Sequence, residues 1–146
     1  MPKLMRQINM ISRIATVYRD DRLKDSDLGA CHHTYILTIC RNPGISQDKL
    51  AQKIFINRSN VTRQLSYLEE KGYVERKQSP TDKRVQLVYP TEKAMEALPF
   101  VREIVGDWND YITEGFSEDE LDCLSDMLGR ILANAKQHAN IKGGDE

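Results

Sequence analysis

The pattern that most limits the fold lies between residues 46 and 90, where two short helical stretches are followed by a strand–turn–strand stretch. Ser46 is a good N-cap for the first helix, whose apolar side chains continue to Ile54. A polar break at Asn57 follows only a few residues later. Because so little chain separates them, we expect the two helices to form a helix-turn-helix.

The second helix is expected over residues 57–71, because Asn57 can cap its start and Gly72 can adopt the left-handed conformation that ends a helix. Its apolar stripe has spacings of four and three and consists of Val61, Leu65 and Leu68. Strand formers are then enriched in residues 73–77 and 85–89, on either side of a polar hairpin tip at 79–84. This order predicts a winged helix-turn-helix.

Longer helices are expected on both sides of this motif. Apolar residues recur at helical spacing over residues 4–18, and a shorter apolar stretch, 31–41, ends at Asn42-Pro43-Gly44. Residues 94–112 form a long helical pattern that Pro99 should kink, and a capping box at 117–120 opens a last helix whose stripe reaches Ala135. The expected order is helix, helix, short helix, helix, hairpin, long helix, helix.

The predicted fold class is mainly α with a small β-hairpin wing: a winged helix-turn-helix with N- and C-terminal dimerisation helices. A length of 146 residues and a 40% hydrophobic content fit one domain over 1–146. We expect residues 31–91 to bind DNA and residues 1–20 and 92–140 to dimerise, since three long apolar stripes exceed what one compact unit buries easily. An ordinary monomeric helical core is the alternative.

Charge is divided unevenly along the chain, although the net charge is only −1. Residues 1–45 have 7 basic and 4 acidic side chains, residues 46–91 have 9 and 5, and residues 92–146 have 5 and 13. A basic middle and an acidic C-terminal third are typical of a protein that presents one face to a polyanion. Solvated helix faces of uneven sign would give the same totals.

The helix over 57–71 is the candidate DNA reader, because a helix fits the major groove while a hairpin reaches the neighbouring backbone or minor groove. At 100° per residue, Ser59, Arg63, Ser66 and Glu70 lie opposite the apolar stripe, with Asn60 and Tyr67 at the margins. Arginine can bond guanine through two N–H groups, asparagine can bond adenine, and hydroxyls can serve base or backbone. Glu70 does not suit phosphate and is expected to lie beyond the groove.

Helix N-terminal ends favour phosphate, and flexible cations at the hairpin tip can enter a narrow minor groove. The candidate DNA-binding residues are therefore Ser46, Gln47, Asn57, Arg58, Ser59, Asn60, Thr62, Arg63, Ser66, Tyr67, Lys83 and Arg84. Helical hairpins with exposed arginines also occur in proteins that never bind DNA. The hairpin with its basic tip and the flanking apolar helices favour the DNA reader.

Four stretches resemble the MarR family of bacterial regulators: ISQDKLA at 45–51, NRSNVTRQL at 57–65, LEEKGYVER at 68–76 and the D-x-R wing signature at 82–84. The first two are similar to the two helices of that family's DNA-binding motif, and the resemblance covers nearly the whole chain. It implies a dimer whose first and last helices intertwine. It also implies that Arg84 enters the minor groove and that Asp82 holds the wing through a salt bridge.

Other kinds of site are poorly supported. In Cys31-His32-His33, consecutive helical residues point about 100° apart and cannot all bind one metal ion. Cys31 with Asp27, or His33 with Asp25 and a distant group, is the alternative, but we expect no metal, and no cofactor either. The surroundings of Cys40 and Cys123 disfavour a redox sensor, whereas Cys31, at an expected helix start, stays open as one. No nucleophile with its base, phosphate-binding glycine loop or H-E-x-x-H pair is present, so an enzyme is not expected.

We therefore expect a homodimeric regulator, a repressor, that binds a pseudo-palindromic operator in double-stranded DNA. No apolar run reaches the roughly 18–20 residues of a membrane span, so a cytoplasmic location without membrane contact is expected. Tyr18, Tyr35 and Trp108 either pack the core or line a cavity for a small aromatic effector, and no effector-binding residue is assigned. The rival function is a winged-helix module that binds another protein.

Overall fold

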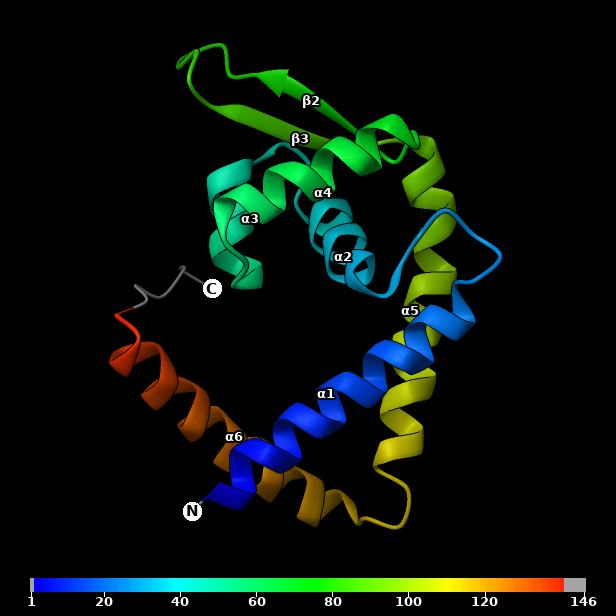
Figure 1. Ribbon diagram of the computed structural model, residues 1–146, viewed down its shortest axis with the longest axis vertical. Helices are drawn as coiled ribbons and strands as arrows, with labels where there is room; N and C mark the ends of the chain where they lie inside the picture. The colour runs from blue at the N-terminus through cyan, green and yellow to red at the C-terminus, as the bar shows by residue number, and fades with distance from the viewer. Residues whose placement is uncertain (1, 141–146) are drawn as a thin grey trace. The chain divides into compact units, whose positions relative to one another are not determined.

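The computed structural model describes residues 2–140, so Met1 and residues 141–146 of the expected single domain lie outside the described part. The elements are α1 (Pro2–Arg22), η1 (Ala30–His32), α2 (His33–Arg41), β1 (Ile45–Ser46), α3 (Gln47–Ile54), α4 (Arg58–Glu70), β2 (Val74–Gln78), β3 (Gln86–Pro90), α5 (Glu92–Ile112) and α6 (Glu118–His138) (Figure 1). The predicted fold class is confirmed. The chain divides into two compact units, and the boundary follows Trp108 inside α5.

The core of the first unit lies between α2, α4, α5 and the sheet. Ile36 and Ile39 of α2, Leu65 and Leu68 of α4 and Val88 of β3 are all almost completely buried. Burying one such side chain stabilises the fold by about 1.5–3 kcal/mol. Since α4 contributes its whole apolar stripe to this core, its opposite face is left to solvent.

The sheet has three antiparallel strands in the order β1-β3-β2. The hairpin strands are displaced by one residue from the expected 73–77 and 85–89, because the N–H of Val85 donates to the carbonyl of Asp82 at 3.0 Å and so belongs to the tip. The short strand β1 was not expected. It pairs Ile45 with Val88, after Gly44, at φ +84°, has turned the chain out of α2.

The helix-turn-helix begins and ends close to the predicted residues. The side chain of Ser46 caps α3 and that of Asn57 caps α4. Lys71 is the C-cap of α4 rather than its last helical residue, and Gly72, at φ +85°, makes the left-handed stop. The stretch expected as a helix over 31–41 begins as the 3-10 turn η1 and becomes α-helical at His33.

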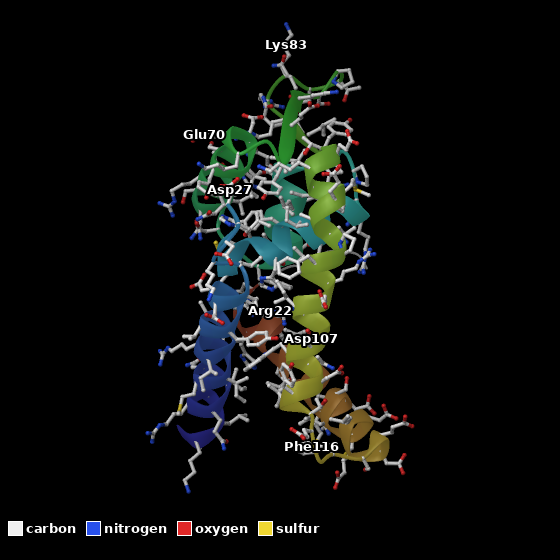
Figure 2. The ribbon with its side chains drawn as sticks, turned by 90° about the vertical axis from the view of Figure 1, so that its right-hand side faces the viewer. Arg22, Asp27, Glu70, Lys83, Asp107 and Phe116 are labelled. Atoms are coloured by element: carbon white, nitrogen blue, oxygen red, sulfur yellow. The ribbon has the colours of Figure 1, made fainter. Side chains whose placement is uncertain are left out.

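The C-terminal half of α1 packs against α5. Arg22 and Asp107 point toward one another and form an ion pair with an N···O distance of 3.0 Å (Figure 2). The rings of Tyr18 and Trp108 lie 5.0 Å apart beside this pair. Further toward the N-terminus the expected stripe of α1 is exposed, and Ile11 and Ile14 are both about half accessible, at 52% and 55%.

Helix α5 runs through Pro99 without interruption. Its buried residues are Ala94, Leu98, Val101 and Ile104. Ile104 faces the core, and the neighbouring Val105 is only half-buried.

The second unit contains the end of α5 and the whole of α6. Ser117 and Glu120 form the predicted capping box: the Ser117 hydroxyl accepts from the Glu120 N–H at 3.1 Å, and the Glu120 carboxylate accepts from the Ser117 N–H at 2.9 Å. Helix α6 has no buried residue. Its exposed large apolar side chains are Leu124, Met127, Leu128 and Leu132.

Candidate nucleic-acid interface

Two helix N-termini open the helix-turn-helix, and side chains cap both. Ser46 Oγ accepts from the Lys49 N–H at 3.2 Å, and Asn57 Oδ1 accepts from the Asn60 N–H at 2.8 Å. The Asn57 oxygen also accepts from the Ser59 hydroxyl at 2.9 Å. Since each cap satisfies one of the orphan N–H groups at a helix start, the remaining ones can bind an anion such as phosphate.

The outer face of α4 is polar and exposed over its first two turns. The Arg63 Nη2 donates to Asn60 Oδ1 at 3.1 Å, which holds the guanidinium along the helix. The Thr62 hydroxyl donates to the Arg58 carbonyl at 2.9 Å and also lies 3.4 Å from Gln47 Nε2. Ser59, Thr62 and Arg63 are exposed, and Asn60 is half-buried. These side chains present N–H and hydroxyl groups of the kind that bond base edges.

Tyr67 lies apart from the other predicted side chains. Its hydroxyl donates to the Asp27 carbonyl at 2.6 Å, and its ring stacks on His32 with a centroid distance of 5.0 Å. The buried His32 in turn contacts α4 through Nε2, which lies 2.9 Å from Gln64 Oε1. The Tyr67 side chain therefore joins α4 to the segment before α2.

His32 is held in one neutral form by its neighbours. The Gly29 N–H donates to Nδ1 at 2.8 Å, so Nε2 carries the proton and donates to Gln64. Burial lowers the pKa of His32, which also favours the neutral ring. The His33 Nδ1 contacts the Ala30 carbonyl instead, at 2.8 Å. Within residues 2–140 no group of three His, Cys, Asp or Glu side chains is arranged to hold a metal ion.

The wing tip is built around Asp82. One carboxylate oxygen accepts from the Arg84 N–H at 3.0 Å and from Arg84 Nε at 3.2 Å, and the other lies 3.3 Å from Arg84 Nη2. Arg84 holds the pKa of Asp82 below its usual range. The Arg84 side chain is still 91% exposed, and Lys83 extends into solvent at the tip (Figure 2). Both cations are therefore accessible to a polyanion.

One important residue of this surface, Arg76, was not predicted from the sequence. Arg76 of β2 contacts α3 and α4 together, through Gln47, Ser66 and Glu69. The alternation along β2 contained a signal, because Arg76 is two residues from the buried Val74 and so shares its inward face. A cation on an inward face requires an acceptor, and Glu69 provides one.

The cysteines give no support to a redox site. Burial raises the pKa of the Cys31 thiol and that of Cys40, so the reactive thiolate is disfavoured in both. A cleft of about 300 Å³ between α2 and α3 is lined by Leu37, Thr38, Arg41, Asn42 and Lys53, which include no nucleophile with its base. No helix within residues 2–140 combines the length and the apolar character needed to span a bilayer.

Known proteins are similar to this chain in sequence and in fold. The sequence profile of the MarR family matches residues 32–85. An HTH-type transcriptional regulator of Bacillus subtilis, YybA, is 29% identical over 137 residues, which cover 94% of this chain and 91% of that protein. The crystal structure of the transcriptional regulator SlyA is 30% identical, with a TM-score of 0.89, and the match covers 92% of this chain and 95% of that one.

A third similar structure contains DNA. It is a MarR family transcriptional regulator from Listeria monocytogenes, crystallised in complex with a 26mer DNA. It is 27% identical to this chain and superimposes with a TM-score of 0.87 over 98% of this chain and 97% of that one.

Proposed function

This chain belongs to the MarR family of winged helix-turn-helix transcriptional regulators, and we propose that it binds duplex DNA sequence-specifically as a homodimer and represses transcription at the sites it occupies. The observation that carries the proposal is the exposed polar face of α4 next to a hairpin whose tip exposes two cations. A helix and a hairpin in this arrangement fit one major groove and the adjacent minor groove. The Listeria relative in complex with DNA supports the proposal.

In this proposal the residues of α4 divide between reading and anchoring. Arg63 and Asn60 read base edges, since a guanidinium can bond guanine and a side-chain amide can bond adenine. Ser59 and Thr62 bond base or backbone. Arg58 and the free N–H groups that follow Ser46 and Asn57 bind phosphates.

The wing supplies the minor-groove contact. Lys83 and Arg84 are placed there because a narrow minor groove has an enhanced negative potential. Asp82 preorganises Arg84 and fixes the turn, which is the wing-structuring role that the family resemblance implies. The side chains of Tyr67 and Ser66 form hydrogen bonds with other parts of the protein. Among the predicted DNA contacts, those of Tyr67 and Ser66 therefore have the least support.

Homodimerisation is supported by apolar side chains that the single chain leaves exposed. In α1 they include Leu4, Ile11 and Ile14, and in α6 they include Leu128 and Leu132. Exposed apolar surface on this scale is typical of an interface. A two-fold dimer would place two α4 helices in major grooves one helical turn apart, about 34–36 Å, so we propose a pseudo-palindromic operator.

The proposal also includes repression of transcription and the release of the repressor from DNA by an effector. A dimer seated on an operator blocks access to the DNA that it covers, and a small effector would release it by favouring a dimer with another spacing between its α4 helices. Tyr18 and Trp108 pack on one another, and Tyr35 is fully buried, so all three have a core role that requires no effector. Screening small aromatic acids for release of the bound fragment tests this part.

The competing function is a winged-helix module that docks a protein on the same face. The two functions differ in their response to salt. DNA binding through about 6–10 phosphates should weaken by roughly 10³–10⁵ between 50 and 200 mM salt, whereas a packed protein interface responds much less.

Selection of bound fragments from genomic DNA tests the proposal directly. We expect the purified protein to enrich fragments that share an inverted repeat, with affinity that falls steeply as salt is added. Enrichment without a shared motif would contradict sequence-specific binding. Absence of binding to any duplex at low salt would contradict the DNA-binding function itself.

A further inference from the structure

The Arg76 side chain bonds three different residues, which belong to two helices of this surface. Its guanidinium donates to Gln47 Oε1 at 3.3 Å, to Ser66 Oγ at 3.1 Å and to Glu69 Oε1 at 3.1 Å. Its main-chain N–H donates to the other oxygen of Glu69, at 3.0 Å. The wing strand β2 is thereby bonded to α3 and α4 through a single residue.

Burial distinguishes this arginine from the one at the wing tip. The Arg76 side chain is 19% exposed, whereas that of Arg84 is 91% exposed. Arg76 therefore has few N–H groups left for DNA and is unsuited to a direct contact. Arginine suits its position because its planar group presents several N–H donors in fixed directions, which an ammonium cannot imitate.

We propose that Arg76 is a positioning residue: it fixes the angle between the wing and α4, so that Arg84 and the reading face of α4 engage the same DNA segment. The inference rests on the proposed DNA-binding function and deepens it.

The angle between the wing and α4 determines where the wing tip lies relative to α4. Arg76 lies inside β2, whereas Lys83 lies in the hairpin tip, beyond the end of that strand at Gln78. A tilt of the hairpin at Arg76 therefore displaces the tip, and a hydrogen bond is lost when its donor–acceptor distance grows by more than about 0.5 Å. A change at Arg76 therefore reaches DNA through the position of Arg84.

The same contacts alter the roles of three neighbours. Gln47 and Ser66, both predicted to bind DNA, are acceptors for Arg76, and in this proposal they help to position the wing. Arg76 also holds the pKa of Glu69 below its usual range, which keeps the carboxylate charged and paired. Without Arg76 that negative charge would stand unpaired near the phosphates.

A double-mutant cycle between Arg76 and Arg84 tests the proposal, with the affinity for the selected fragment measured at several salt concentrations. We expect Arg76→Met and Arg84→Ala each to weaken binding by about 10-fold and to reduce the salt slope by a similar amount. If Arg76 acts through the wing, the affinity of the double variant will be at most about 3-fold below that of the single variant that binds less tightly. Additive losses of about 100-fold would overturn the proposal.

Lys77→Met is the matched control, because it removes one cation from the next position of β2 without touching α3 or α4. Lys77 approaches Glu75 and the Tyr89 ring. Its effect on affinity is expected to be additive with that of Arg84→Ala. Coupling as strong as that of Arg76 would show that any lost charge on β2 gives the same result, and would overturn the specific role of Arg76.

Two further variants separate position from charge. Arg76→Lys keeps the charge but cannot reach three acceptors at once, so it should lose affinity and be non-additive with Arg84→Ala, as Arg76→Met is. Arg76→Met with Glu69→Gln removes the unpaired carboxylate and should still bind weakly. Recovery of wild-type affinity in either variant would mean that charge alone matters, and would overturn the proposal.

Failure of this inference differs from failure of the proposed function. If the wild-type protein binds no duplex at low salt, the proposed function is wrong and Arg76 has nothing to position. If the wild type binds and Arg76→Met binds equally well with an unchanged salt slope, the function stands and the positioning role is wrong. Thermal unfolding of each variant, with a midpoint above the assay temperature, ensures that folded protein is compared.

Discussion

At the scale of single residues, the reading face of α4 is organised before any DNA is present. Asn57 accepts from the N–H of Asn60, and Asn60 in turn accepts from the Arg63 guanidinium. A guanidinium held in this way loses less rotational freedom when it bonds a base. The order of Asn57, Asn60 and Arg63 along the helix therefore matters, because each residue orients the next one.

Arg63→Ala should relax base preference at one position in each half-site, because a single guanidinium bonds a single base pair. The expected loss is about 1–3 kcal/mol for the preferred base at that position, with little change elsewhere. Competition binding with fragments substituted one base pair at a time measures it. A loss that is uniform over all fragments would instead identify Arg63 as a phosphate contact.

The environment of Tyr35 allows a prediction about the stability of the fold. It is fully buried in α2, and its hydroxyl has no hydrogen-bond partner among the described residues. A buried hydroxyl without a partner costs stability, because its bonds to water are lost and not replaced. Burial also raises the pKa of Tyr35 to about 12.

Tyr35→Phe should therefore stabilise the fold by about 1 kcal/mol at neutral pH. The folded pKa exceeds that of the unfolded chain, so the folded state of the wild type keeps its proton while the unfolded state loses it. Wild-type stability should thus fall as the pH rises from 10 toward 12, by about 1.4 kcal/mol per unit, and this part of the decrease should be absent from the variant. Urea unfolding at several pH values measures both effects, and a variant less stable at pH 7 would show that the hydroxyl is bonded.

At the scale of elements, the junction between α4 and β2 depends on Gly72. Its φ of +85° is unfavourable for any residue with a Cβ, while an added Cβ would meet only Lys93 Cδ, at an ordinary 3.8 Å. The cost of a side chain there is therefore backbone strain alone.

Gly72→Ala should reduce the free energy of unfolding by about 1 kcal/mol. Gly106→Ala is its matched control, because Gly106 lies inside α5, where an added Cβ meets no atom within 4 Å. It should raise stability by about 0.5–1 kcal/mol, since alanine favours helix over glycine. Thermal unfolding compares the two, and a shift of the same sign in both would contradict the assignment.

Helix limits could be predicted because the signals that set them are local. Asn57 and Ser117 cap helices that begin with the next residue, and Gly72 ends α4 where the pattern indicated. Strand limits depend on pairing with distant residues. Ile45 is a strand residue only because Val88, 43 residues later, lies beside it.

The candidate site shows the same division. The exposed face of α4 followed from helical periodicity, and it contains Ser59 and Arg63 as expected. The same periodicity left Tyr67 at the margin of that face, and no local signal reveals that His32, 35 residues earlier, stacks on its ring. The contacts of Gln47 and Ser66 with Arg76 could not be predicted, because they form only after the strand and the helices have come together.

At the scale of the whole molecule, the chain leaves apolar surface unburied in both of its units. Ile11 and Ile14 of α1 belong to the first, and Leu128 and Leu132 of α6 belong to the second. Burying apolar surface stabilises a protein by roughly 25 cal/mol per Å², and a lone chain that leaves these residues in water lacks this stabilisation. Association of two copies recovers it, which is the physical basis of the proposed dimer.

Leu128→Asp should weaken dimerisation strongly, because it places an unpaired charge in an apolar interface. Binding to a fragment with two half-sites should be lost with it, while each unit keeps its own fold. Ala133→Asp is the control, since residue 133 lies on the opposite face of α6 at 100° per residue. That variant should sediment and bind as the wild type does.

The central claim, that two copies read one operator through paired α4 helices, is tested most directly by the mass of the complex. Sedimentation equilibrium of the wild-type protein with one selected duplex, at 50 mM salt, gives the number of protein copies per duplex. We predict two copies per duplex, bound cooperatively, and no stable complex with Leu128→Asp. One copy per duplex, or a Leu128→Asp monomer that binds the same fragment equally well, would contradict the claim.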